Sequence, residues 1–158
     1  SHGQSTRYYH DVVGCNSRLD AMQAVILDIK LKQLDDYIAS RRKAADFYDK
    51  AFAGNPKIKT PFRAANNKHV FHQYTLILDG VNRDELSAFL TAADVPNMIY
   101  YPVPAHRQKT VDALGGSSFN LPVTDWLTER VISLPIHTEL DEEQQQFVVS
   151  KVLEFIEK

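Results

Sequence analysis

Apolar residues recur at helical spacing along the first third of the chain. Over residues 19–52 they follow a 3.6-residue period with slips, and charged residues fill the remaining positions. This pattern predicts one long helix, or two helices with a bend, ending at the turn formed by Gly54, Asn55 and Pro56. The charged side chains along it are expected to be solvated.

Further along, the spacing changes from helical to alternating. Apolar and polar β-forming residues alternate over residues 69–78, which predicts a strand buried on one face and partly on the other. Two shorter strands are predicted over residues 98–101 and 130–134. Pro135 stops the last of these.

Capping residues mark the helices between and after these strands. Asn82 followed by Glu85 has the spacing of a capping box and predicts a helix that continues to residue 93. Shorter helices are predicted over residues 108–114 and 124–129. Asp141 is expected to cap the final helix. The predicted apolar face of that helix contains Phe147, Val148, Val152, Phe155 and Ile156.

The order of these elements predicts an α+β fold. A long N-terminal helix is followed by a small, mainly antiparallel sheet, with helices packed on one face because such strands cannot bury themselves. Residues 19–53 would form the connecting helix, and residues 54–158 one small domain.

Composition restricts the classes of partner. The chain has 158 residues, 44% of them hydrophobic, and a net charge of −2, so neither nucleic acid nor a membrane is expected as a partner. Cys15 is the only cysteine, which excludes an internal disulfide and agrees with a cytoplasmic location. No metal site is expected, because His69 and His72 match no zinc spacing and residues three apart on a strand face opposite sides.

The run from Gly14 to Ala24 places polar groups at a helix entry. Asn16 stands where a helix start is usually capped, and Arg18 follows it. An amide and a guanidinium there could hold an anion. A simple helix cap with a surface arginine explains the same residues.

A second run, Tyr100-Tyr101-Pro102-Val103-Pro104-Ala105-His106, carries candidate chemistry. The prolines fix the backbone and present His106 at the end of a stiff segment. A histidine held in this way can donate to a phosphate or sugar oxygen. A structural turn with an exposed histidine is the alternative.

Both runs resemble motifs of one protein family. The run at residues 14–24, with His2-Gly3 and residues 7–11 before it, resembles the DegT/DnrJ/EryC1/StrS nucleotide-sugar aminotransferases, pyridoxal-phosphate enzymes of fold type I. The second run resembles the family's tyrosine-proline-x-proline-leucine-histidine stretch, with Ala105 in place of leucine. The resemblance implies that residues 1–18 are a remnant of the large cofactor domain and line the active-site cleft. The fold would be the family's small C-terminal domain.

The resemblance also implies roles for individual residues. Asn16 would reach the cofactor phosphate of the partner in a homodimer with shared active sites. The substrate, a nucleotide-linked keto-sugar, would be bound by Arg18, His106, Tyr9, His10 and Tyr101. The parent enzyme would transfer an amino group, from glutamate, in lipopolysaccharide, O-antigen or capsule synthesis.

In this family the Schiff-base lysine precedes the histidine-glycine motif, which here is His2-Gly3. The chain is therefore expected to be an excised C-terminal part that holds no catalytic residue and does not itself bind pyridoxal phosphate. The alternative is a non-catalytic regulatory or interaction module derived from the family.

Overall fold

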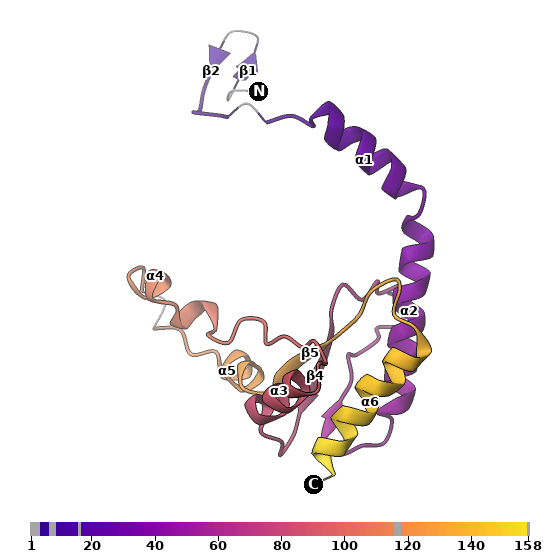
Figure 1. The fold of residues 1–158 in the computed structure, drawn as a ribbon. Coiled ribbons are helices and arrows are strands. Elements are labelled where there is room, and N and C mark those ends of the chain that lie inside the picture. The colour runs from indigo at the N-terminus through magenta and orange to yellow at the C-terminus, as the bar shows by residue number, and fades with distance from the viewer. Residues whose placement is uncertain (1–3, 7–8, 16, 116–117, 158) are drawn as a thin grey trace. The chain divides into compact units, whose positions relative to one another are not determined.

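The computed structural model describes residues 4–6, 9–15, 17–115 and 118–157 of the chain (Figure 1). The chain divides into two compact units, Ser1–Asp36 and Tyr37–Lys158. The domain boundaries expected after residues 18 and 53 stay predictions.

The first unit holds a short hairpin and a helix. Strands β1 (Gln4–Thr6) and β2 (Tyr9–His10) pair antiparallel, and the sequence pattern did not predict them. Helix α1 (Ala21–Leu31) begins after Asp20, whose Oδ1 accepts a hydrogen bond from the Met22 amide at 2.8 Å. The expected cap at Asn16 is wrong, because a cap must directly precede the first helical residue. Asn16 itself lies outside the described residues.

The segment predicted as one long helix, or as two, forms two helices. The helical hydrogen bonding is interrupted at Lys32 and Gln33, and helix α2 (Leu34–Ala51) follows. No residue of α1 is buried, although apolar side chains lie on all its sides.

In the second unit, three strands form the antiparallel sheet that the pattern predicted. The order is β3 (Ile58–Lys59), β4 (Tyr74–Leu78), β5 (Val131–Leu134). Strand β4 is shorter than the predicted strand over residues 69–78, because the backbone of Phe71 is left-handed, with φ of 52°. Residues 98–101 do not form a strand either: only Met98 pairs with β5, through Ser133.

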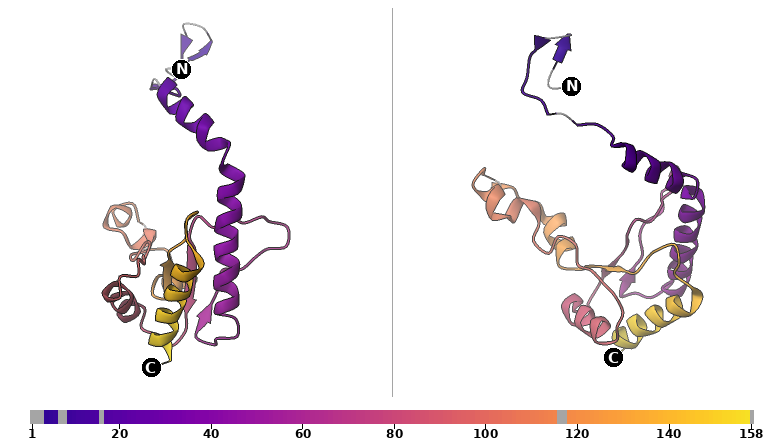
Figure 2. Two further views of the ribbon diagram at one scale, coloured as in Figure 1. Left: turned by 45° about the vertical axis from the view of Figure 1, so that its right-hand side comes forward. Right: turned by 45° about the horizontal axis from the view of Figure 1, so that its top comes forward.

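One face of this sheet carries the hydrophobic core. Side chains of β4 alternate between buried and half-buried positions, so the same strand serves the core and the opposite face. Helices α2, α3 (Arg83–Ala92) and α6 (Glu142–Ile156) contribute to one cluster with the sheet (Figure 2). Its buried members include Tyr48, Phe52, Tyr74, Leu76, Leu86, Leu90, Ile132 and Val152.

Helix α6 has the predicted cap but a different buried face. Asp141 and Gln144 form a reciprocal capping box. Phe147 was expected in the core but is 47% exposed. Val149 and Gln145 are buried instead, and Gln145 is satisfied by donating to the carbonyl of Leu140 at 2.9 Å.

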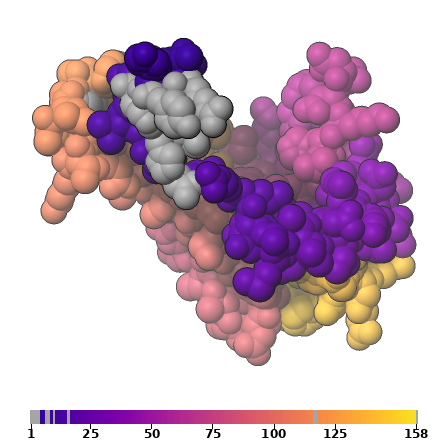
Figure 3. Space-filling view, turned by 90° about the horizontal axis from the view of Figure 1, so that it is seen from above, coloured from indigo at the N-terminus to yellow at the C-terminus, as the bar shows by residue number. Residues whose placement is uncertain are grey.

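The segment between α3 and β5 contains three short helical turns: η1 (Ala105–Arg107), α4 (Lys109–Asp112) and α5 (Pro122–Thr128). Helix α4 extends away from the sheet, and the orange surface of Figure 3 belongs to this part of the chain. None of the helices in the described parts of the chain combines the length and apolarity needed to cross a membrane.

A hydrogen bond and two ion pairs hold the loop that leads into β4. The Tyr74 hydroxyl donates to Asp49 at 2.6 Å, and Arg63 bridges Asp46 and Asp49 at 2.6 and 2.7 Å. The Arg63 guanidinium also lies over the Phe71 ring, 4.6 Å from its centre. Loop and helix α2 are therefore joined at the edge of the core.

Replacing Tyr74 tests its hydrogen bond to Asp49. Burial, and then the hydrogen bond to Asp49, raises the pKa of the Tyr74 phenol, so it stays a neutral donor over the ordinary pH range. Tyr74→Phe should lower the free energy of unfolding by about 1.5–3 kcal/mol, the typical value for a hydrogen bond to a charged group. The measurement is urea unfolding, with Tyr37→Phe as the control because that hydroxyl has no hydrogen-bond partner among the residues that the structure describes.

The same pKa shift sets the pH range of the effect. A raised pKa stabilises the fold fully below the unfolded value of about 10, and this stability is lost as the pH rises toward the folded value. The difference between the wild type and Tyr74→Phe should therefore be constant through neutral pH and shrink as the pH rises above about 10. A difference that vanished near neutrality would contradict the assignment.

Candidate functional site

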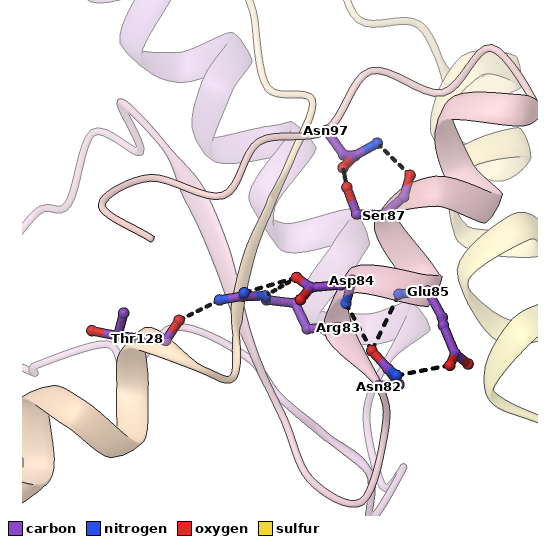
Figure 4. Close-up of polar contacts among 7 residues, drawn as sticks. All are labelled: Asn82, Arg83, Asp84, Glu85, Ser87, Asn97 and Thr128. Carbon is purple, nitrogen blue, oxygen red and sulfur yellow. Dashed lines mark hydrogen bonds and ion pairs between the residues drawn. The ribbon is translucent and has the colours of Figure 1, made fainter. Parts of the chain in front are cut away.

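The segment after Met98 is fixed to the sheet and to α3. Met98 and Ser133 exchange two backbone hydrogen bonds, of 3.1 and 2.8 Å, at the outer edge of β5. Just before it, the Asn97 side chain accepts from the Ser87 hydroxyl at 2.6 Å and donates to the carbonyl of Ser87 at 3.3 Å (Figure 4). The chain therefore leaves α3 and the sheet in a defined direction toward Tyr101.

Tyr101 occupies a strained backbone position. Its φ is 55°, in the left-handed region that non-glycine residues rarely adopt, and Pro102 follows. Its side chain is 82% exposed. Strain of this kind costs about 1–3 kcal/mol and is concentrated at functional sites. An exposed aromatic ring in such a position is a candidate ligand contact.

His106 is placed differently from the expectation. Pro104 precedes the turn η1, and the His106 side chain there is 6% exposed rather than presented to solvent. Neither ring nitrogen has a hydrogen-bond partner among the described residues. The nearest charged group is Asp125, whose Oδ1 lies 3.3 Å from His106 Nε2.

Asp125 belongs to a charged cluster that joins η1 to α5. Arg107 donates from Nε to Oδ1 at 2.8 Å and from Nη2 to Oδ2 at 2.6 Å, a two-pronged pair. These hydrogen bonds are the largest cause that lowers the pKa of the Asp125 carboxyl. Asp125 therefore stays ionised, and His106 faces a carboxylate.

Two arginines hold helix α5 in place. Arg83, at the start of α3, donates to the carbonyl of Thr128 and also pairs with Asp84 at 2.7 Å (Figure 4). Arg130 donates to the carbonyl of Trp126 at 3.0 Å and lies 5.0 Å from the centre of its ring. The position of Asp125 thus depends on contacts from α3 and from the chain beside β5.

Two adjoining cavities lie over the second face of the sheet. One, of about 250 Å³, is lined by Asn97, Tyr100 and Ser133, and the other, of about 320 Å³, by His69 and Thr75. Both are also lined by His72 and Gln73. Sequence reasoning missed these polar residues as a group. The alternation along β4 was the available signal, since it puts Gln73 and Thr75 on the face opposite the core.

The other expected site residues lie in the first unit. Tyr9 and His10 are on β2, and the Tyr9 side chain is exposed. Arg18 is exposed in the segment before α1. Of the expected residues in the second unit, Tyr101 and His106 share one segment, but one side chain is exposed and the other buried. The structure thus does not bring those two side chains into one open pocket.

Comparison with known proteins identifies relatives over nearly the whole chain. The chain is 44% identical over 156 residues to a pleiotropic regulatory protein of Geobacillus stearothermophilus, covering 98% of this chain and 41% of that protein. It is 44% identical over 140 residues to a UDP-2-acetamido-2-deoxy-3-oxo-D-glucuronate aminotransferase of Pseudomonas aeruginosa, covering 89% of this chain and 37% of that enzyme. The chain therefore spans about two-fifths of the length of these relatives.

Solved structures agree with this relationship. The crystal structure of DesV from Streptomyces venezuelae, in complex with a ketimine intermediate, matches with a TM-score of 0.88 and 34% identity. The match covers 99% of this chain and 42% of DesV. The predicted fold class, a small antiparallel sheet with helices after a long helical segment, is thereby confirmed. The model of the DegT/DnrJ/EryC1/StrS aminotransferase family matches residues 1–153, and the chain belongs to that family.

Proposed function

We propose that this chain is the C-terminal part of a pyridoxal-phosphate-dependent aminotransferase acting on a nucleotide-linked keto-sugar. The single observation that carries this is the match of the family over residues 1–153, with relatives named as transaminases of UDP- and dTDP-linked sugars. The amino donor is proposed to be glutamate, and the product to enter lipopolysaccharide, O-antigen or capsule synthesis. The protein would work in the cytoplasm as a homodimer with shared active sites.

We also propose substrate-binding roles for five residues. Arg18 would hold a sugar carboxylate or the diphosphate, because a guanidinium can pair two oxygens at once. Tyr9, His10, Tyr101 and His106 would line the nucleotide-sugar site. The exposure and backbone strain of Tyr101 support its part in this proposal.

Four lysines of the described residues are poorly placed to hold pyridoxal phosphate. Lys57 donates to the carbonyl of Ile156 at 2.7 Å, and Lys151 pairs with Glu154 at 2.8 Å, so both serve the fold. Lys43 and Lys50 line a cavity of about 540 Å³, but the lining also contains three carboxylates that would repel a phosphate: Asp46, Asp141 and Glu142. We propose that the lysine that holds the cofactor lies outside this chain, and that the cofactor supplies the electron sink there.

A regulatory module is the second candidate function. It is favoured by one observation, the 44% identity to a relative named as a pleiotropic regulatory protein. The sequence before His2 in the parent protein would separate the two candidates. A lysine some tens of residues upstream favours the enzyme, and its replacement favours the module.

The isolated chain should form no internal imine with pyridoxal phosphate. Mixing the two should give neither the imine absorbance band nor a borohydride-stable adduct at a single lysine. Bovine serum albumin, with many surface lysines, serves as the control for non-specific adducts. A stoichiometric adduct at one lysine of the chain would overturn the proposal that this residue lies elsewhere.

Asn16→Ala in the full-length protein should weaken binding of the cofactor. Loss of one hydrogen bond to a charged phosphate costs about 1.5–3 kcal/mol, which corresponds to a roughly ten- to hundredfold lower affinity. Titration of pyridoxal phosphate into the apo-protein measures this. Asn55→Ala, at the turn after α2, is the matched control, and equal affinities in the two variants would remove Asn16 from the cofactor site.

Arg18→Lys should raise the KM for the keto-sugar nucleotide by about ten- to hundredfold, because an ammonium cannot replace a two-pronged contact. The half-reaction with glutamate should be unchanged, since it takes place without the sugar. Stopped-flow absorbance of the cofactor resolves the two half-reactions. Arg42→Lys controls for the change of cation, and equal losses in both half-reactions would assign Arg18 a structural role.

A further inference from the structure

The His106 ring is the most unusual polar group in the second unit. Its side chain is 6% exposed, yet neither Nδ1 nor Nε2 has a hydrogen-bond partner among the described residues. Buried polar groups in folded proteins are nearly always paired, so an unpaired one calls for a specific explanation. The ring needs a partner for each nitrogen, and the structure offers a candidate for only one of them.

That candidate is the Asp125 carboxylate. Its Oδ1 lies 3.3 Å from Nε2, near hydrogen-bond distance but without hydrogen-bond alignment. Hydrogen bonds of catalytic and binding groups are often long or misaligned before a ligand binds, and they tighten in the complex. A small turn of the ring would align Nε2–H with Oδ1.

The carboxylate is held independently of the ring. The two-pronged pair with Arg107 fixes both oxygens, and the carbonyl contact from Arg83 fixes the end of α5. An ionised carboxylate only accepts hydrogen bonds. In a neutral ring, the nitrogen that faces such a group carries the proton, here Nε2, which leaves Nδ1 as an acceptor.

We propose that Asp125 is a positioning residue that keeps the proton of His106 on Nε2, so that Nδ1 accepts a hydrogen bond from a hydroxyl or imide N–H of the bound nucleotide sugar. This rests on the proposed function. It reverses the donor role first expected for His106, because a neutral Nδ1 acceptor cannot pair with a phosphate oxygen. Because Nδ1 of His106 is buried, the segment that carries η1 must shift when the ligand binds.

The test uses the full-length protein with ¹⁵N-labelled histidine, and His106→Gln identifies the resonances of this ring. In the wild type, Nε2 should carry the proton. In Asp125→Asn, the single amide oxygen should keep the shorter contact, with Arg107 Nη2 at 2.6 Å, which places the NH₂ at the Oδ1 position facing the ring, and the proton should move to Nδ1. An unchanged tautomer in Asp125→Asn overturns the proposal, as does a dominant Nδ1–H form in the wild type.

Steady-state kinetics distinguish a positioning role of Asp125 from a purely structural ion pair with Arg107. Asp125→Asn should raise the KM for a keto-sugar nucleotide about three- to tenfold, the effect of one neutral hydrogen bond, with kcat nearly unchanged. Arg107→Gln also breaks the ion pair but leaves the carboxylate facing His106, so its KM should rise less. Equal KM values in the two variants would mean that only the ion pair matters and would overturn the proposal.

Asp112→Asn, on α4, is the matched control for the loss of one exposed carboxylate and should match the wild type in both readouts. Circular dichroism reports folding of each variant. If Asp125→Asn does not fold, the tautomer of His106 in the wild type still tests the proposal. Should no keto-sugar nucleotide be a substrate, the proposed function fails, while the tautomers of the wild type and Asp125→Asn still test the positioning role.

Discussion

The second unit depends on the alternation of side chains along β4. Tyr74, Leu76 and Leu78 point into the core, where α2, α3 and α6 meet, and Thr75 and Ile77 face the other way. One strand therefore anchors the fold with three of its five residues and presents Thr75 and Ile77 on the opposite face. β4 lies between β3 and β5, and a one-residue change in its register would move its core residues to the opposite face.

That opposite face carries paired hydroxyls rather than charges. The Thr75 and Ser133 hydroxyls lie 2.7 Å apart across β4 and β5, and Gln73 continues the same face toward the adjoining cavities. Such groups both donate and accept, so they suit neutral hydroxylated ligands as well as solvent. Two charged clusters of this unit, around Asp49 and Asp125, fix loops instead.

The sequence predicted helices and the core best where the determinants are local. The helix caps at Asn82 and Asp141 depend on residues within three positions, and both side chains accept from the first turn of their helices as predicted. Glu85, however, pairs with the side chain of Asn82 rather than with its backbone. The strand over residues 69–78 was overestimated because the Phe71 backbone is left-handed and the carbonyls of Phe71 and His72 accept from Arg41, which was expected to be solvated. That contact spans some thirty residues, and no local pattern could reveal it.

The burial errors have the same origin. Phe147 and Val149 are both apolar and lie two positions apart on α6, so periodicity alone could not tell which one faces the sheet. His106 was expected at an exposed position because the prolines around it stiffen the chain, but stiffness does not determine what a side chain meets. Its neighbour Asp125 comes from α5, nineteen positions later, and only the fold brings them together.

Helix α1 is rich in apolar residues but buries none of them. Its apolar residues lie on all sides, as in helices that are buried in a larger core, yet none is buried in its own unit. A helix with this composition gains its stability from surfaces that cover it, since short isolated helices are marginal in water. This is the arrangement expected if α1 packs against other parts of a larger protein, in agreement with relatives more than twice as long as this chain. The second unit, by contrast, has a core of its own, formed by contacts within this chain.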